Sequence, residues 1–169
     1  MKKYLKSLLP LVFAVSLTST AFASMLSAPT GPVLLTVSGS ITETNDGDVA
    51  KFDRAMLETL DWKTIEAHTR WTDGATSFSG ASLSAVLDAV GATGKNLIAI
   101  ALNDYAVEIP VSDALEYNEL LAMEINGEPM KIRDKGPIWI IYPQTEEEAN
   151  EPRFDEKMIW QLKSIKIGD

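Results

Sequence analysis

Apolar and polar residues alternate along much of the chain after residue 30, with the two-residue period of half-buried strands. Two runs, 97–102 and 138–142, are apolar without interruption, which predicts strands buried on both faces. Asn126-Gly127 between two apolar stretches is a strong hairpin signal. The strands expected from these patterns cover residues 33–37, 63–71, 97–102, 105–109, 120–125, 130–132, 138–142 and 157–167.

The clearest helical pattern covers residues 82–90, where apolar positions recur at intervals of three and four. Ser82 can cap its first turn, and Gly91 can end it. Together the patterns predict an α+β domain, with a mixed, mostly antiparallel sheet assembly and a few short helices. The remaining elements are expected to be helices over 49–60, capped by Asp48, and over 112–118, and an acidic loop over 146–151.

The first 23 residues differ in composition from the rest. A basic start, a short apolar middle and the small-residue end Ala21-Phe22-Ala23 are the three parts of a secretory signal peptide. The alternative is a permanent N-terminal anchor, but Pro10 interrupts the apolar run, which is also short for a bilayer. We therefore predict cleavage after Ala23, a periplasmic location, and a single domain over 24–169 that is not inserted in the membrane.

Charge and cysteine content exclude several functions. The chain carries 15 basic and 24 acidic residues, a net charge of −9. Cleavage would remove three lysines and no acid, leaving 12 basic against 24 acidic residues, or −12. A surface this acidic repels phosphate backbones, which argues against nucleic acid as a partner. The chain contains no cysteine, which excludes thiolate catalysis and cysteine-ligated metal.

Common catalytic motifs are also missing from the sequence. It has no Gly-x-Ser-x-Gly elbow, and its glycine pair at 91–94 has neither dinucleotide nor phosphate-loop spacing. His68 is the only histidine, so a histidine-rich zinc site is excluded. Threonines at 42 and 44 stand where a calcium loop needs carboxylates.

The first candidate cluster precedes the turn at 72–74 and contains His68, Arg70, Trp71 and Asp73. An indole can stack on a flat heteroaromatic ligand, and a guanidinium can donate to a carbonyl or phosphate. Strand alternation, however, puts Trp71 and Arg70 on opposite faces unless the strand ends between them. The pattern alone favours Trp71 as a core residue, with His68 and Arg70 on a solvated face.

Two further clusters lie beside buried strands, and both can also be explained as plain surface turns. Asn103-Asp104-Tyr105 follows the strand expected at 97–102. Arg133-Asp134-Lys135-Gly136 precedes the strand expected at 138–142, and its cations and backbone N–H groups could receive an anion. Trp160 lies in an alternating segment, which favours a core position.

Several segments, in this order, resemble motifs of the sulfite-oxidase-type molybdopterin-binding fold. Residues 78–91 resemble its "W-x-G-V-x-L…LL…G" stretch, and residues 120–130 resemble "LLA-x-x-x-NG-x-PL". Asn103-Asp104-Tyr105 resembles "DGY", residues 136–143 resemble "GGPLRLVVP", and residues 159–162 resemble "VKWL". The resemblance runs from about residue 33 to residue 167 and implies this fold for nearly the whole domain.

The sequence departs from the family at two points. Family enzymes hold molybdenum through a cysteine upstream of the first motif, and here that position falls near His68 in a chain without cysteine. Trp139 stands where the enzymes usually place an arginine. Both departures argue against a molybdenum oxidoreductase, although a molybdopterin-dependent oxidoreductase or an accessory redox protein remains the alternative.

A narrower resemblance is to a small periplasmic subgroup without the cysteine, which includes pterin-binding regulators. These act on the periplasmic part of an inner-membrane cyclic-di-GMP synthase/phosphodiesterase. The resemblance implies a non-catalytic protein that binds a pterin or a molybdopterin-like ligand without molybdenum, and that signals to such a membrane partner. The ligand-binding residues expected on this basis are His68, Arg70, Trp71, Asp73, Asn103, Asp104, Tyr105, Arg133, Lys135 and Trp139.

Overall fold

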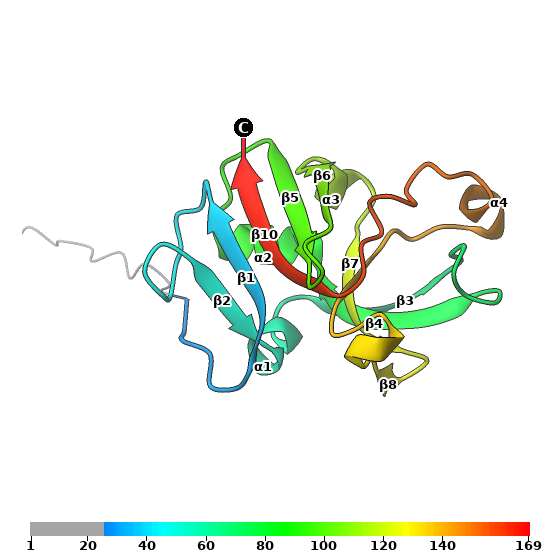
Figure 1. The fold of residues 1–169 in the computed structure, drawn as a ribbon, viewed down its shortest axis with the longest axis horizontal. Coiled ribbons are helices and arrows are strands. Elements are labelled where there is room, and N and C mark those ends of the chain that lie inside the picture. The colour runs from blue at the N-terminus through cyan, green and yellow to red at the C-terminus, as the bar shows by residue number, and fades with distance from the viewer. Residues whose placement is uncertain (1–25) are drawn as a thin grey trace, which may run out of the picture.

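The computed structural model describes residues 26–169, so the predicted signal peptide lies outside the described residues. Two sheets make up the framework, and both are visible in Figure 1. Short helices connect their strands. Among the described residues, no helix has the length and apolar character needed to cross a membrane.

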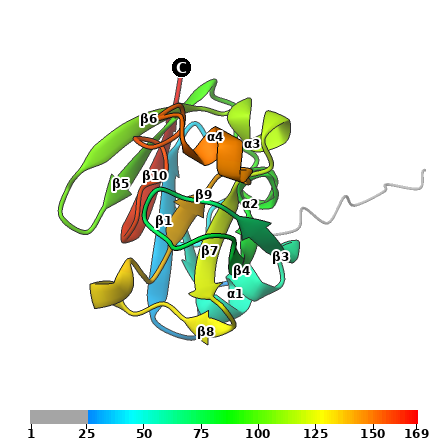
Figure 2. The same cartoon turned by 90° about the vertical axis from the view of Figure 1, so that its right-hand side faces the viewer.

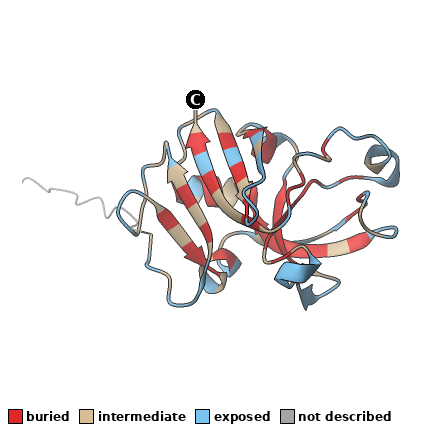
Figure 3. Ribbon diagram, in the orientation of Figure 1, coloured by how far each residue is buried: buried red, intermediate tan, exposed pale blue. Residues whose placement is uncertain are grey.

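The first sheet has the strand order β2-β1-β10-β5-β6. Its central pair, β1 and β10, is parallel, and every other pairing in it is antiparallel. Buried and less buried residues alternate along these strands (Figure 3), because one face packs on the core. The strands are β1 (Val33–Gly39), β2 (Ala50–Asp53), β5 (Asn96–Ala101), β6 (Ala106–Pro110) and β10 (Leu162–Gly168).

The second sheet is antiparallel throughout, with β3-β4-β7-β8 in order and β9 paired with β7. Figure 2 shows β9 beside β7 in the middle of the molecule. The mixed, mostly antiparallel α+β architecture predicted from the sequence is therefore confirmed. The strands are β3 (Trp62–Ala67), β4 (Thr76–Ser82), β7 (Leu120–Ile125), β8 (Glu128–Pro129) and β9 (Trp139–Ile141).

The helices are short and lie between strands. Ser82 caps α2 as predicted, its hydroxyl accepting from the Ala85 N–H, and Gly91 follows the helix at φ +57°. The Asn126-Gly127 hairpin joins β7 and β8, also as predicted. The helices are α1 (Arg54–Glu58), α2 (Leu83–Ala89), α3 (Asp113–Glu116) and α4 (Glu146–Ala149), with a 3-10 helix, η1 (Ile132–Asp134).

Several local predictions were wrong. The strand expected over 130–132 is the chain that leads from β8 into η1, because the hairpin partner of β7 is only the two-residue strand β8. The helix expected over 49–60 is β2 followed by α1, because Asp53, and not Asp48, accepts from the Met56 N–H and starts the helix. The expected acidic loop is α4, which begins with a capping box of Thr145 and Glu148. In β5 only one face is buried, since Ile98 is 40% exposed. The strand β4 was missed because its small residues carry a weak apolar pattern.

Glu119 is the most deeply buried of the charged residues that the structure describes. Its side chain is fully buried, and neither carboxyl oxygen has a hydrogen-bond partner among the described residues. Burial raises the pKa of this carboxyl from its ordinary 4.5 to about 7, with the nearby Asp113 charge adding to the effect and Lys157 opposing it. The ionised form is therefore destabilising in the folded protein.

We predict that Glu119→Gln removes a pH-dependent loss of stability. Between pH 4.5 and 7 the folded protein keeps the Glu119 proton while the unfolded chain releases it, so the free energy of unfolding falls as pH rises. The shift corresponds to about 3 kcal/mol. Urea denaturation should therefore show the advantage of Glu119→Gln over wild type growing by about 2–3 kcal/mol from about pH 5 to 8. Glu116→Gln, an exposed acid on α3, is the control, and equal pH profiles for wild type and Glu119→Gln would contradict the assignment.

Candidate functional site

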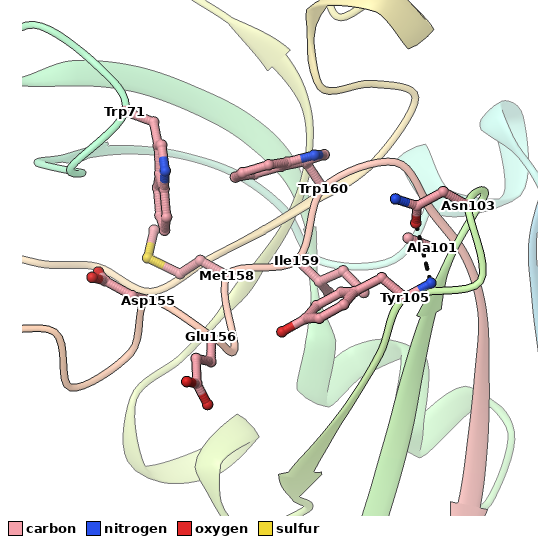
Figure 4. Close-up of a pocket in the computed structure, with 9 residues that line it drawn as sticks. All are labelled: Trp71, Ala101, Asn103, Tyr105, Asp155, Glu156, Met158, Ile159 and Trp160. Carbon is pink, nitrogen blue, oxygen red and sulfur yellow. Dashed lines mark hydrogen bonds between the residues drawn. The ribbon is translucent and has the colours of Figure 1, made fainter.

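A cavity of about 400 Å³ lies between the turn joining β5 to β6 and the segment that leads into β10. Figure 4 shows the side chains of Trp71, Trp160 and Tyr105 around it, with two carboxylates at one side. Its lining is largely aromatic and apolar. The residues that line it are Trp71, Ala101, Asn103, Tyr105, Asp155, Glu156, Met158, Ile159 and Trp160.

Three tryptophans meet edge to face beside this cavity. The ring centroids of Trp71 and Trp160 are 5.4 Å apart, and those of Trp71 and Trp139 are 6.1 Å apart. Trp139 is fully buried in β9, whereas Trp160 is 36% exposed. Edge-to-face contact at these distances is favourable for aromatic rings. Trp139 therefore supports the two indoles that reach the cavity.

Trp71 reaches the cavity because β3 ends earlier than its alternation suggested. The strand stops at Ala67, and the chain then turns. The Thr69 hydroxyl accepts from the Trp71 N–H at 3.1 Å and also pairs with the Thr72 hydroxyl at 2.9 Å. Since the backbone is no longer extended at residues 70 and 71, the strand rule that puts neighbouring side chains on opposite faces does not apply to Arg70 and Trp71.

Arg70 contributes indirectly, through a carboxylate of the lining. Its Nε lies 3.1 Å from Oδ2 of Asp155. Glu156, the next residue, also lines the cavity. None of the nine lining residues is basic, so the cavity offers indole and phenol surfaces together with negative charge. Such a site favours flat ligands with N–H donors and disfavours anions.

The turn after β5 forms the opposite wall. The Asn103 side-chain oxygen accepts from the Tyr105 N–H at 3.1 Å, which fixes the turn that presents Tyr105. Asp104 lies outside the lining and pairs with Lys163 at 2.6 Å. The hydrogen bond and charge of Lys163 hold the pKa of Asp104 below its ordinary value.

The structure brings together only some of the residues singled out in the sequence. Trp71, Asn103 and Tyr105 line the cavity, and Arg70 is bonded to its lining. His68 and Asp73 do not line it, and His68 with Arg70 borders a separate hollow next to α4. Arg133, Lys135, Asp104 and Trp139 also lie outside the lining.

The chain matches the family model of the oxidoreductase molybdopterin binding domain over residues 51–148, more than half of its length. It belongs to this family. A comparison with curated proteins found no match to the chain. The match supports the sulfite-oxidase-type fold expected from the motifs. The match ends at residue 148, before five of the nine residues that line the cavity. These five are Asp155, Glu156, Met158, Ile159 and Trp160.

Sequence reasoning missed this last segment. The alternation over 157–167 predicts one continuous strand, and this strand puts Trp160 in the core. In the structure β10 begins only at Leu162, and Trp160 forms an isolated bridge with Trp139. The resemblance of 159–162 to the closing family motif was the available signal, but it did not indicate which side chains face a ligand.

The donor set of this molybdopterin-binding domain does not fit the complete molybdenum cofactor. The chain has no cysteine to ligate the metal, and residues 26–169 contain no group of three or more His, Asp or Glu side chains placed to hold a metal. Molybdopterin carries a phosphate, which would be repelled by Glu156, a lining carboxylate without an ion-pair partner among the described residues.

We predict that the protein purified from its native source contains far less than one molybdenum per chain. The reason is that its remaining candidate ligands are thioethers, carboxylates and one imidazole, and none replaces a thiolate for this metal. Elemental analysis of the purified protein measures this ratio directly. A ratio near one molybdenum per chain would show that the metal is held without protein sulfur and would contradict the prediction.

Proposed function

We propose that this domain binds a pterin in the aromatic cavity without performing catalysis. The observation that carries the proposal is the combination of two supported indoles and two carboxylates in a cavity whose lining has no basic residue. A pterin is a flat ring with an amino-pyrimidinone edge, on which adjacent N–H groups point in the same direction. Indoles can stack on the ring, and a carboxylate can accept from the edge in a two-pronged geometry.

Glu156 is the carboxylate best placed for this edge. One oxygen of Asp155 is occupied by Arg70. Glu156 has no ion-pair partner among the described residues and is exposed beside the cavity. We therefore assign Glu156 as the acceptor for the pterin edge and Asp155 with Arg70 as its neighbour at the rim.

We further propose that the protein is periplasmic and signals to an inner-membrane cyclic-di-GMP synthase/phosphodiesterase. The composition of the first 23 residues supports export. A basic turn, residues 131–135, supports contact with another protein, because it carries Lys131, Arg133 and Lys135 in a strongly acidic domain. Between the first two of these cations, Ile132 is 59% exposed.

Two hydrogen bonds connect this basic turn to Gln161, the residue that follows Trp160 of the cavity lining. The Gln161 side chain donates to the Ile132 carbonyl at 2.8 Å, and the Gln161 N–H donates to the Lys135 carbonyl at 2.9 Å. Gln161 directly follows Trp160. A ligand that shifts Trp160 would therefore act on the basic turn through two hydrogen bonds.

We predict that Trp71→Ala and Trp160→Ala each weaken pterin binding. The two indoles touch edge to face at 5.4 Å, so one of them stacks on the ring and the other holds it in place. Loss of the stacking indole should cost about ten- to hundredfold, because a lost stacking partner costs about 1–3 kcal/mol, and loss of the other should cost less. Calorimetric titration with tetrahydrobiopterin measures the affinity, and urea denaturation checks that each variant folds. Trp62→Ala, in the tryptophan that lies outside the cavity at the start of β3, is the matched control. Glu156→Gln should also weaken binding, by about tenfold, while Glu146→Gln on α4 should not. Folded variants of Trp71 and Trp160 that bind as well as wild type would refute the site.

The partner proposal predicts that reversing charge in the basic turn weakens the protein complex alone. Lys131→Glu with Arg133→Glu should lower the affinity for the periplasmic domain of the membrane partner by about tenfold or more. Pterin affinity should stay unchanged, since neither residue lines the cavity. Lys166→Glu, an exposed lysine on β10, is the control. Biolayer interferometry measures the affinity for the partner domain. If the control and the turn variant lose affinity equally, the turn is not the contact surface.

A further inference from the structure

The segment 155–160 supplies five of the nine lining residues but belongs to no helix or strand. Its end next to β10 is fixed by backbone bonds, including the Ile140 N–H to the Ile159 carbonyl at 3.0 Å, and side-chain contacts hold the rest of it. The Trp139 indole N–H donates to the Met158 carbonyl at 2.9 Å. Just before the segment, Phe154 stacks on Tyr142 with ring centroids 4.4 Å apart. Contacts of this kind set the width of the cavity.

Lys157 is a charged contact of this segment. It lies between the lining residues Glu156 and Met158, but its ammonium group is 2.6 Å from Oδ2 of Asp113 on α3. The Tyr142 hydroxyl donates to the same oxygen at 3.0 Å. The Asp113 side chain is only 8% exposed. Lys157 therefore ties the segment to α3 through a largely buried ion pair.

Glu119 adjoins this ion pair. The titratable groups that act on its carboxyl are Asp113 on α3, Tyr142 after β9 and Lys157 in the segment. Neither Glu119 oxygen is hydrogen-bonded within residues 26–169, and burial together with Asp113 raises its pKa to about 7. The same negative charges and burial raise the pKa of Tyr142, so its hydroxyl remains a donor.

We propose that Lys157, Asp113 and Glu119 are positioning residues of the ligand cavity, and that the protonation state of Glu119 sets how firmly segment 155–160 is held. With Glu119 neutral, Lys157 and Asp113 balance each other. With Glu119 ionised, the cluster holds one uncompensated buried negative charge. That charge is relieved when Lys157 turns toward Glu119 or when water enters, and either change moves the two cavity residues next to Lys157.

The consequence, which rests on the proposed pterin binding, is that ligand affinity falls as pH rises through about 7. Each conversion to the loosened form releases one proton from Glu119 to solvent. A purely structural ion pair between Lys157 and Asp113, without a role for Glu119, predicts the same pH profile of affinity in wild type and Glu119→Gln.

The test is made from about pH 6 to 8 in a His68→Gln background, which removes the only imidazole of the chain. It compares this background protein, called wild type here, with the same protein carrying Glu119→Gln or Glu116→Gln. Tetrahydrobiopterin affinity should fall about fivefold or more in wild type and Glu116→Gln, and the fall should be absent in Glu119→Gln. Lys157→Met should bind weakly at every pH, and Lys157→Arg should restore part of the affinity. Tryptophan emission of the ligand-free proteins, measured with Trp62→Phe so that the remaining signal comes from the indole cluster of Trp71, Trp139 and Trp160, should show a transition near pH 7 that Glu119→Gln lacks.

The emission measurement separates failure of this inference from failure of the proposed function. If no protein binds the pterin but the emission transition is present in wild type and absent in Glu119→Gln, pterin binding fails and the positioning role stands. If wild type binds the pterin with the same pH profile as Glu119→Gln, the positioning role is overturned and pterin binding stands. Identical emission profiles for the two proteins also overturn it.

Discussion

The packing of Trp139 against Trp71 and Trp160 is the contact on which both the fold and the cavity depend. Trp139 lies in β9 of the second sheet, fully buried, and its indole also meets Phe78 of β4 edge to face at 5.5 Å. Trp160 lies in the segment that enters the first sheet, and it bridges to Trp139 through the backbone. The indole cluster therefore joins the two sheets, and the cavity opens where the cluster reaches the surface.

The same arrangement explains how a fold associated with molybdopterin can lack the usual metal ligand. The family match covers the framework from β2 to α4, whereas most of the cavity lining comes from residues 155–160. An aromatic core residue at 139 occupies a position where the resemblance places an anion-binding arginine. The cavity therefore presents aromatic surfaces, and its lining has carboxylates where a phosphate would require positive charge.

The fold class was predictable from the sequence because the apolar periodicity and the turn residues pointed to the same elements. Ser82, Gly91 and Asn126-Gly127 each act locally, so their roles could be recognised without tertiary information. The predictions at 49–60 and at β4 failed because short strands of small or mixed residues are defined by their neighbours in the sheet.

The candidate site could be predicted only in part, for a similar reason. Asn103 and Tyr105 were recognised because they stand beside a turn, where side chains commonly reach a surface site. Trp71 was recognised through the family resemblance, since its pattern alone favoured the core. Trp160 was misplaced because its exposure depends on where β10 begins, which the long alternating pattern conceals. The buried interaction of Glu119 with Asp113 and Lys157 joins residues far apart in the sequence, and no local pattern indicates it.

A crystal structure of the protein grown with tetrahydrobiopterin tests the central claim most directly. We expect the pterin ring in the cavity lined by Trp71, Trp160 and Tyr105, stacked on one of the two indoles, with its amino-pyrimidinone edge within hydrogen-bond distance of Glu156. A ring bound elsewhere, such as in the hollow beside His68 and Arg70, would contradict the account. So would a ring in the cavity whose edge points away from the carboxylates.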